Sequence, residues 1–139
     1  MKNSLILLFL LIIFSSNTPN LYINKDKIDK EMNDKIWEAL VNAICIIESN
    51  NNDNAINPRS GASGRFQMKT IYVDEVNRIL KQNKYKYSDR FDAKKSREMF
   101  EIYQSHHNPT KDINKAIVIH RGKHSKKYIN AVKKEMKYI

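Results

Sequence analysis

Cysteine, glycine and proline are all scarce in this chain of 139 residues, which contains one cysteine, three glycines and three prolines. The lone Cys45 has no partner for an intrachain disulfide, and its position within an apolar stretch predicts a small buried side chain. So few glycines and prolines leave long stretches without a turn signal, which disfavours a sheet of many short strands. We therefore expect an all-α fold, and the length allows one domain with one modest hydrophobic core.

Acidic residues are also scarce. The chain contains 15 aspartates and glutamates and 25 lysines and arginines, which gives a formal net charge of +10 at pH 7. Such a charge predicts an anionic partner, and nucleic acid, a membrane surface and an anionic cell-wall polymer would each fit. Basic residues are dispersed along the C-terminal segment at Lys123, Lys126, Lys127, Lys133, Lys134 and Lys137. Solvated helix faces explain these lysines equally well, so the charge alone does not choose the partner.

The first 20 residues differ in composition from everything that follows. Lys2 precedes the unbroken apolar run from Leu5 to Phe14, and polar residues follow it. This run is shorter than the roughly 20 apolar residues that cross a bilayer, so we interpret residues 1–20 as a signal peptide. Because Ser16 makes a poor cleavage signal, an uncleaved N-terminal membrane anchor is the alternative. Both interpretations predict export and place the folded domain in residues 21–139.

Apolar spacing and capping residues predict five helices. Their expected ranges are Ile28 to Ser49, Gln67 to Leu80, a third from the cap Asp92 to His107, a fourth from the cap Thr110 to near Gly122, and a fifth from the cap Ser125 to Met136. In the first of these, Trp37, Val41 and Ile44 share one face with Glu48. The segment from Ala43 to Ile47 has no polar face, which is typical of a central, buried helix.

Glu48 stands directly after that apolar segment, at the end of the first expected helix. Burial disfavours the ionised form of a carboxyl group, and so does the negative end of the helix dipole. Both effects raise the pKa of Glu48. A carboxylic acid that keeps its proton near neutral pH can donate it to a glycosidic oxygen. The competing interpretation is a solvated glutamate at a frayed helix end, because glutamate is rarely buried.

The loop after Glu48 supplies further polar and small residues. Gly61 to Gly64 form a small-residue turn through which a ligand could approach the backbone. Gln67 follows with an amide that can both donate and accept hydrogen bonds, as recognition of a sugar N-acetyl group requires. Taken singly, these residues would also fit an ordinary turn and an ordinary helix start.

The order and spacing of three segments resemble the core of the soluble lytic transglycosylases, the lysozyme-like enzymes that cut the glycan strands of peptidoglycan. The segments are Ile47-Glu48-Ser49, Asn54-Ala55-Ile56-Asn57-Pro58 and Gly61-Ala62-Ser63-Gly64-Arg65-Phe66-Gln67-Met68. Weaker similarity continues through Tyr72 to Ile79, His120-Arg121-Gly122, and the pair Tyr128 and Val132. The resemblance covers roughly residues 36–135 and implies a lysozyme-like helical domain with an active-site groove.

This resemblance implies that Glu48 is the sole catalytic carboxylate, acting first as an acid and then as a base. It further implies that substrate is bound by Ser49, Gly64, Gln67, Met68, His120, Arg121 and Tyr128. Four positions depart from the family pattern. His120 stands where many members have a tyrosine that helps to position the catalytic glutamate, and Arg121 replaces the usual asparagine. Lys69 replaces a frequent methionine, and Thr70 stands where a proline is usual. No cofactor is implied.

Two other functions compete with the transglycosylase interpretation. A hydrolytic lysozyme on the same scaffold would need a second acid such as Asp53 to activate water, although Asp53 also fits a simple turn-forming role. A non-enzymatic protein that binds wall polymer or nucleic acid would account for the charge, but the export segment argues against nucleic acid. We expect no metal site at His106, His107, Asn108 and His124, because structural and catalytic sites need three or four convergent ligands.

The expected partner is therefore the peptidoglycan glycan strand, and the expected location is the periplasm, the cell envelope or the extracellular space. An uncleaved N-terminal segment would be the one membrane contact. Local wall opening for a secretion or conjugation apparatus, phage entry and wall turnover would all use the same chemistry.

Overall fold

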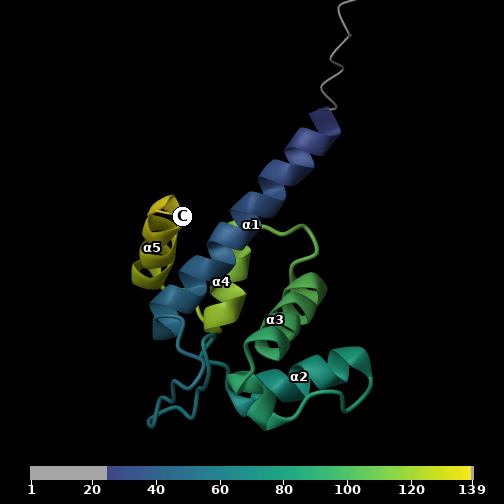
Figure 1. Ribbon diagram of the computed structural model, residues 1–139, viewed down its shortest axis with the longest axis vertical. Helices are drawn as coiled ribbons and strands as arrows, with labels where there is room; N and C mark the ends of the chain where they lie inside the picture. The colour runs from purple at the N-terminus through teal and green to yellow at the C-terminus, as the bar shows by residue number, and fades with distance from the viewer. Residues whose placement is uncertain (1–24, 139) are drawn as a thin grey trace, which may run out of the picture.

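A computed structural model describes residues 25–138, and the expected export segment lies outside this part of the chain. The described residues confirm the all-α class, with five α-helices, two short 3-10 helices and no named strand (Figure 1). The elements are α1 (Lys25–Ser49), α2 (Thr70–Leu80), η1 (Tyr87–Phe91), α3 (Ala93–His107), α4 (Ile113–Arg121), α5 (Lys126–Glu135) and η2 (Met136–Tyr138). No described helix has both the length and the apolar composition needed to cross a membrane.

Helix α1 is divided into an exposed half and a buried half. Residues 25–36 are exposed on every side and project beyond the other helices (Figure 1). From Trp37 onward the face containing Val41 and Ile44 is buried, as the spacing predicts. Cys45 is buried as well, and burial raises the pKa of its thiol to about 12. Ile47 is 37% exposed, so the expectation that this segment is buried all round was wrong at that residue.

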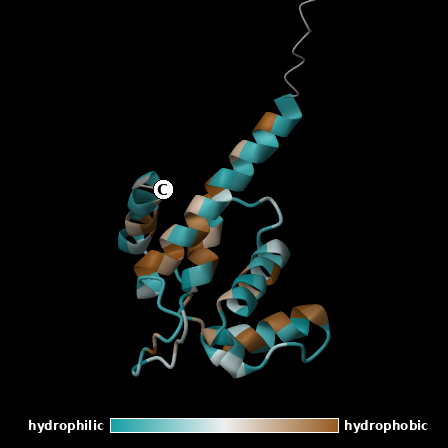
Figure 2. Cartoon of the chain, viewed as in Figure 1, coloured by the Kyte–Doolittle hydropathy of each residue, from teal (hydrophilic) through white to brown (hydrophobic). Residues whose placement is uncertain are grey.

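The other helices pack around the buried half of α1. Helices α4 and α5 contact α1 and each other, while α2 packs on α3 and α3 contacts α4. The projecting half of α1 is mostly hydrophilic, with single hydrophobic residues, whereas hydrophobic residues are more frequent in its packed half (Figure 2). All five helices contribute to the core, which includes Leu40, Ile44, Val73, Val76, Met99, Phe100, Ala116, Ile117 and Val132.

The capping predictions are confirmed for two helices and wrong for a third. The side chain of Asp92 accepts a hydrogen bond from the Lys95 backbone at the start of α3, and Ser125 caps α5 in the same way. Helix α4 is capped by Asp112 instead of Thr110. Asn108 explains the difference, because its side chain binds both backbone groups of Asp112 and holds the chain in a turn until that residue.

The predicted start of the second helix was also wrong, because α2 begins at Thr70 and not at Gln67. Gln67 has a φ of 49°, which is incompatible with a right-handed helix. Met68 and Ser63 exchange backbone hydrogen bonds of 2.9 and 3.0 Å across the loop. Residues 67–69 therefore complete the loop that begins after α1, and this loop places Gln67 close to the end of that helix.

Candidate active site

Glu48 lies in the last turn of α1, and its side chain is only 10% exposed. Burial raises the pKa of its carboxyl group, while the Tyr128 hydroxyl and the positive charge of Arg121 act in the opposite direction. The net shift is upward, in the direction that the sequence predicts. The interpretation of Glu48 as a solvated residue at a frayed helix end is thereby excluded, and Glu48 has the environment of a general acid.

Tyr128 on α5 is the closest polar neighbour of Glu48. Its hydroxyl donates a hydrogen bond of 2.6 Å to Oε1 of Glu48. Burial, followed by the adjacent carboxyl group, raises the pKa of the Tyr128 hydroxyl far above its usual value, so this group keeps its proton and remains a donor. Arg121 covers the Tyr128 ring, with its guanidinium carbon 5.0 Å from the ring centre. The expected substrate-binding residue Tyr128 thus contacts the carboxyl group of Glu48, the expected catalytic residue, directly.

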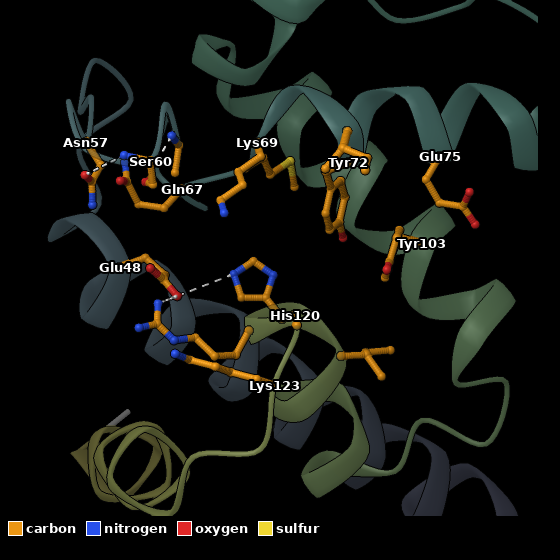
Figure 3. A pocket seen from close by; sticks show the side chains of 16 residues that line it. Glu48, Asn57, Ser60, Gln67, Lys69, Tyr72, Glu75, Tyr103, His120 and Lys123 are labelled. Carbon is orange, nitrogen blue, oxygen red and sulfur yellow. Dashed lines mark hydrogen bonds and ion pairs between the residues drawn. The ribbon is translucent and has the colours of Figure 1, made fainter.

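His120 and Arg121, at the end of α4, reach the same carboxyl oxygen at longer distances. Nε2 of His120 lies 3.8 Å from Oε1 of Glu48, and Nη1 of Arg121 lies 3.9 Å from it (Figure 3). Burial lowers the pKa of His120 to about 4, and the charge of Arg121 acts in the same direction. The imidazole is therefore neutral at physiological pH, and it contributes a polar edge to the site without a charge.

A groove of about 740 Å³ opens beside Glu48. Among the residues that line it are Glu48, Gln67, Met68, Lys69, Tyr72, Glu75, Tyr103, His120, Arg121 and Lys123. Figure 3 shows Glu48 at one end of the groove, His120 near its middle, and Tyr103 and Glu75 toward the other end. Five of the sequence-predicted site residues, Glu48, Gln67, Met68, His120 and Arg121, thus line one groove.

Gln67 presents one particular half of its amide to a ligand. Its amide nitrogen, Nε2, donates to the backbone oxygens of Gly64 at 3.0 Å and Ala55 at 3.3 Å. These bonds fix the orientation of the side chain and occupy its donor. The amide oxygen is consequently the group that remains available, and it can accept a hydrogen bond from the N–H of a bound acetamido group.

Ser49 and Gly64 are not among the residues that line the groove, although the family resemblance implies that both bind substrate. The Ser49 hydroxyl donates to the Arg65 backbone oxygen at 2.9 Å and ties the end of α1 to the loop. Gly64 has a φ of +75°, and a Cβ there would lie 1.8 Å from the backbone oxygen of Arg90. These two residues hold the loop in place. Met68 lines the groove but is only 2% exposed, so it belongs mainly to the core.

Two aromatic residues of the groove received no site role from the sequence. The rings of Tyr72 on α2 and Tyr103 on α3 stack with centroids 4.2 Å apart, and both line the half of the groove away from Glu48. Helical spacing alone identifies such residues as core positions. Only the packing of α2 on α3 shows that their stacked rings also form a groove wall.

Glu75 is the second carboxyl group among the described residues that line the groove, and its oxygens are already engaged by neighbouring side chains. Glu75 accepts hydrogen bonds of 2.6 Å from Arg78 and lies 3.2 Å from Nε2 of His107. The hydrogen bonds from Arg78, reinforced by the charge of Arg78 and by His107, hold the pKa of Glu75 down at about 2. Glu75 is thus an ionised partner in an ion pair at neutral pH, and it is not a general acid.

Asp53, the candidate second acid, does not line the groove. Its carboxylate forms a two-pronged ion pair with Arg65, with distances of 2.5 and 2.8 Å. The hydrogen bonds from Arg65 lower the pKa of Asp53. Residues 25–138 contain no group of three or more potential metal ligands. Asn108, one of the residues considered for metal binding, uses its side chain on the Asp112 backbone.

An all-α fold with a buried carboxyl group at the end of its central helix, opening onto a groove, is the arrangement of lysozyme-like domains. The family model described as Transglycosylase SLT domain matches residues 27–118, more than half of the chain, and the protein belongs to this family. Domains of this family act on peptidoglycan. No curated protein and no solved structure matches the chain. The family match ends before His120, Arg121 and Tyr128, so it is the geometry that connects these three residues with Glu48.

Proposed function

We propose that the protein is a lytic transglycosylase that cleaves the β-1,4 bond between N-acetylmuramic acid and N-acetylglucosamine and leaves 1,6-anhydro-muramic ends. The observation that carries this proposal is the state of Glu48, a buried carboxyl group with a raised pKa at one end of a groove. Among the described residues, the one other acid that lines the groove is Glu75, toward its opposite end (Figure 3). A mechanism with a single carboxyl group fits this arrangement.

The first step uses Glu48 as an acid. Its protonated carboxyl gives a proton to the bridging oxygen, the glycosidic bond breaks, and N-acetylglucosamine departs with a free hydroxyl group. Oε1 of Glu48 accepts the hydrogen bond from Tyr128 and is the oxygen that His120 and Arg121 approach at 3.8 and 3.9 Å, so we assign the transferred proton to Oε2. The acetamido oxygen of the muramic residue stabilises the oxocarbenium-like carbon, as in substrate-assisted glycosidases.

The second step uses the same residue as a base. Ionised Glu48 removes the proton from the muramic 6-hydroxyl, the 6-oxygen bonds to the anomeric carbon, and the acetamido oxygen is released. No water is consumed, and Glu48 regains the proton that it gave away. The hydrogen bond from Tyr128 stabilises the carboxylate between the two steps, because charge-assisted hydrogen bonds are the stronger kind.

Hydrolysis on the same scaffold would need another group to activate water. Arg65 engages the carboxylate of Asp53. The carboxylate of Glu75 is occupied by its ion pair with Arg78 and by its contact with His107. Both observations favour the intramolecular route over a two-carboxylate lysozyme mechanism.

Digestion of purified peptidoglycan by the protein, followed by mass spectrometry of the products, tests the proposal. We expect muramic ends that are one water lighter than the products of hydrolysis, and products with the full added water would contradict it. Glu48→Gln should abolish turnover while leaving the helical circular dichroism spectrum unchanged. Retained turnover would remove Glu48 from the mechanism, and a soluble wall-binding protein without any turnover would support the non-enzymatic alternative.

We further propose that the protein is exported and works in the cell envelope, with residues 1–20 acting as a signal peptide or as an uncleaved membrane anchor. Its target would be the glycan strand, opened locally for a secretion or conjugation apparatus, for phage entry or for wall turnover. Fractionation of producing cells tests the location. A protein retained in the cytoplasm would contradict export, and a membrane-bound full-length chain would favour the anchor.

A further inference from the structure

Two lysines line the groove from different elements. Lys69 stands immediately before α2, and Lys123 follows Gly122, the C-cap residue of α4. In Figure 3 they extend from opposite sides of the groove toward the end that contains Glu48. Both residues are exposed, and neither has an ion pair or a hydrogen-bonded side chain within residues 25–138. Their ammonium groups are therefore available to a ligand.

Among the described residues that line the groove, no carboxylate in an ionised pair lies at the end where these lysines point. Arg121 adds a third positive charge there, and His120 is neutral because burial lowers its pKa to about 4. Glu48 itself is shifted toward its protonated form by burial. The ionised Glu75 lies toward the other end and is neutralised by Arg78. The half of the groove nearest the catalytic group thus favours a substrate that carries negative charge close to the cleaved bond.

The backbones that carry the two lysines are held in place by helix ends. The carbonyl of Lys69 accepts a hydrogen bond of 3.0 Å from the Tyr72 backbone in the first turn of α2. The residue before Lys123 is held in the left-handed conformation, and its N–H donates to the Val118 carbonyl at 3.0 Å. Both lysine side chains therefore start from fixed backbone positions on the two walls, so that only the side chains need to be ordered when they bind an anion.

The chemistry of muramic acid supplies such an anion. Its ring carries a lactyl ether next to the acetamido group, and hence close to the anomeric carbon at which the chain is cut. In strands that carry stem peptides, the lactyl carboxyl is an uncharged amide. In strands without stem peptides, it is an ionised carboxylate. This carboxylate is attached directly to the sugar, whereas the carboxylates of a stem peptide lie farther along the peptide.

We propose that Lys69 and Lys123 bind free lactyl carboxylates, so that the enzyme prefers glycan strands from which the stem peptides have been removed. This inference rests on the proposed function, because it concerns the substrate of the same groove. It also places the enzyme in a reaction sequence. A hydrolase that cuts the amide bond between the lactyl group and the stem peptide must act first to supply this substrate.

The test compares the full-length protein on three preparations of one pool of glycan strands: strands with stem peptides, strands without them, and stem-free strands whose lactyl carboxyls have been converted to simple amides. We expect kcat/KM to be highest on the stem-free strands, by about fivefold for each lysine that pairs with a carboxylate, which corresponds to about 1 kcal/mol. The amidated strands should lose this advantage, because only the charge differs. Added salt should reduce it.

The decisive variant replaces both groove lysines, Lys69→Gln and Lys123→Gln, in one protein. In this double variant, the ratio of kcat/KM on stem-free strands to kcat/KM on amidated strands should be close to one. The matched control is Lys94→Gln with Lys133→Gln, which removes the same charge from exposed sites outside the groove and should keep the ratio of the parent protein. Equal kcat/KM on stem-free and amidated strands in the parent protein would overturn the inference. A preference that survives in the Lys69 and Lys123 double variant would do the same.

Binding of the same strands to Glu48→Gln separates this inference from the proposed function, because it needs no turnover. We expect tighter binding of stem-free than of amidated strands, and loss of that difference when both groove lysines are also replaced. A clear binding preference without any turnover in the parent protein would contradict the proposed function and support this inference. Turnover without any binding preference would support the proposed function and overturn this inference.

Discussion

The Tyr128 hydroxyl donates a hydrogen bond of 2.6 Å to Oε1 of Glu48, across 80 residues of sequence. His120 and Arg121 approach the same oxygen at 3.8 and 3.9 Å. The two carboxyl oxygens of Glu48 are therefore unequal, because Oε1 accepts the hydrogen bond from Tyr128 and is the oxygen paired with His120 and Arg121 at these distances. The hydrogen bond from Tyr128 holds the carboxyl group in position, and in the proposed mechanism we assign the transferred proton to Oε2.

Tyr128→Phe tests the role of that hydrogen bond. The bond stabilises the ionised form of Glu48 and so lowers its pKa, and its loss should raise the pKa of Glu48. The basic limb of the profile of kcat/KM against pH should move to higher pH, and kcat should fall about tenfold or more, as expected for a lost charge-assisted hydrogen bond. Tyr87→Phe is the control, because that hydroxyl binds Asp74 on the exposed surface. An unchanged profile in Tyr128→Phe would contradict the positioning role.

His120 should make folding stability sensitive to acid. Its pKa is lowered to about 4 in the folded protein, chiefly by burial, whereas the unfolded chain has an ordinary value near 6.5. The unfolded state therefore binds more protons in this interval. The contribution to stability is complete above about pH 6.5 and is lost as the pH falls toward 4, by up to about 3 kcal/mol.

Urea unfolding of the parent protein and of His120→Phe at pH 7 and pH 4.5 measures this effect. Phenylalanine suits the site, because the His120 ring packs among Phe66, Phe100 and Tyr72. The free energy of unfolding should fall less on acidification in His120→Phe than in the parent protein. Identical falls in the two proteins would mean that His120 is not a buried neutral group.

Gly64 and Gly61 form a matched pair for a test of the loop. Both have a positive φ, but a Cβ at Gly64 would meet the Arg90 backbone oxygen at 1.8 Å, whereas a Cβ at Gly61 would meet nothing within 4 Å. Gly61→Ala should cost about 1 kcal/mol for the left-handed backbone alone. Gly64→Ala should cost about 3 kcal/mol or more, because the backbone must also shift. Thermal and urea unfolding measure both, and equal costs would contradict the close packing.

Asp53→Asn distinguishes the structural role of Asp53 from a catalytic one. The pair with Arg65 is about one-third exposed, so its loss should cost no more than about 1 kcal/mol of stability. Turnover of peptidoglycan should stay within a few-fold of the parent value, because Asp53 lies outside the groove. A loss of turnover comparable with that of Glu48→Gln, in a protein that remains folded, would instead support the two-carboxylate hydrolase.

The parts of the site that local sequence determines could be predicted. Glu48 follows an apolar segment within one helix, and Gln67 follows a turn rich in small residues, so the local sequence is enough to single out both side chains. The cap of α3 is equally local, because Asp92 binds a backbone group three residues away. The position of the α4 cap could not be predicted, since it depends on how the Asn108 side chain fixes the Asp112 backbone.

Features that depend on contacts between distant segments were beyond sequence reasoning. The turn around Gly64 was expected to let a ligand approach the backbone. The space beside Gly64 is instead filled by the backbone of Arg90, which belongs to a segment after α2. The stacked pair of Tyr72 and Tyr103 forms a groove wall only because α2 packs on α3. His120 is neutral only because several aromatic rings enclose it. Each of these features depends on burial and tertiary packing, which residue spacing and sequence motifs do not predict.

The most direct test of the central claim, that Glu48 alone completes both halves of the reaction, is digestion of peptidoglycan in water labelled with a heavy oxygen isotope. An intramolecular closure by the muramic 6-hydroxyl should incorporate no label into the new muramic ends. Uniform incorporation of one labelled oxygen at each new end would show that water attacks the anomeric carbon, and it would contradict the account.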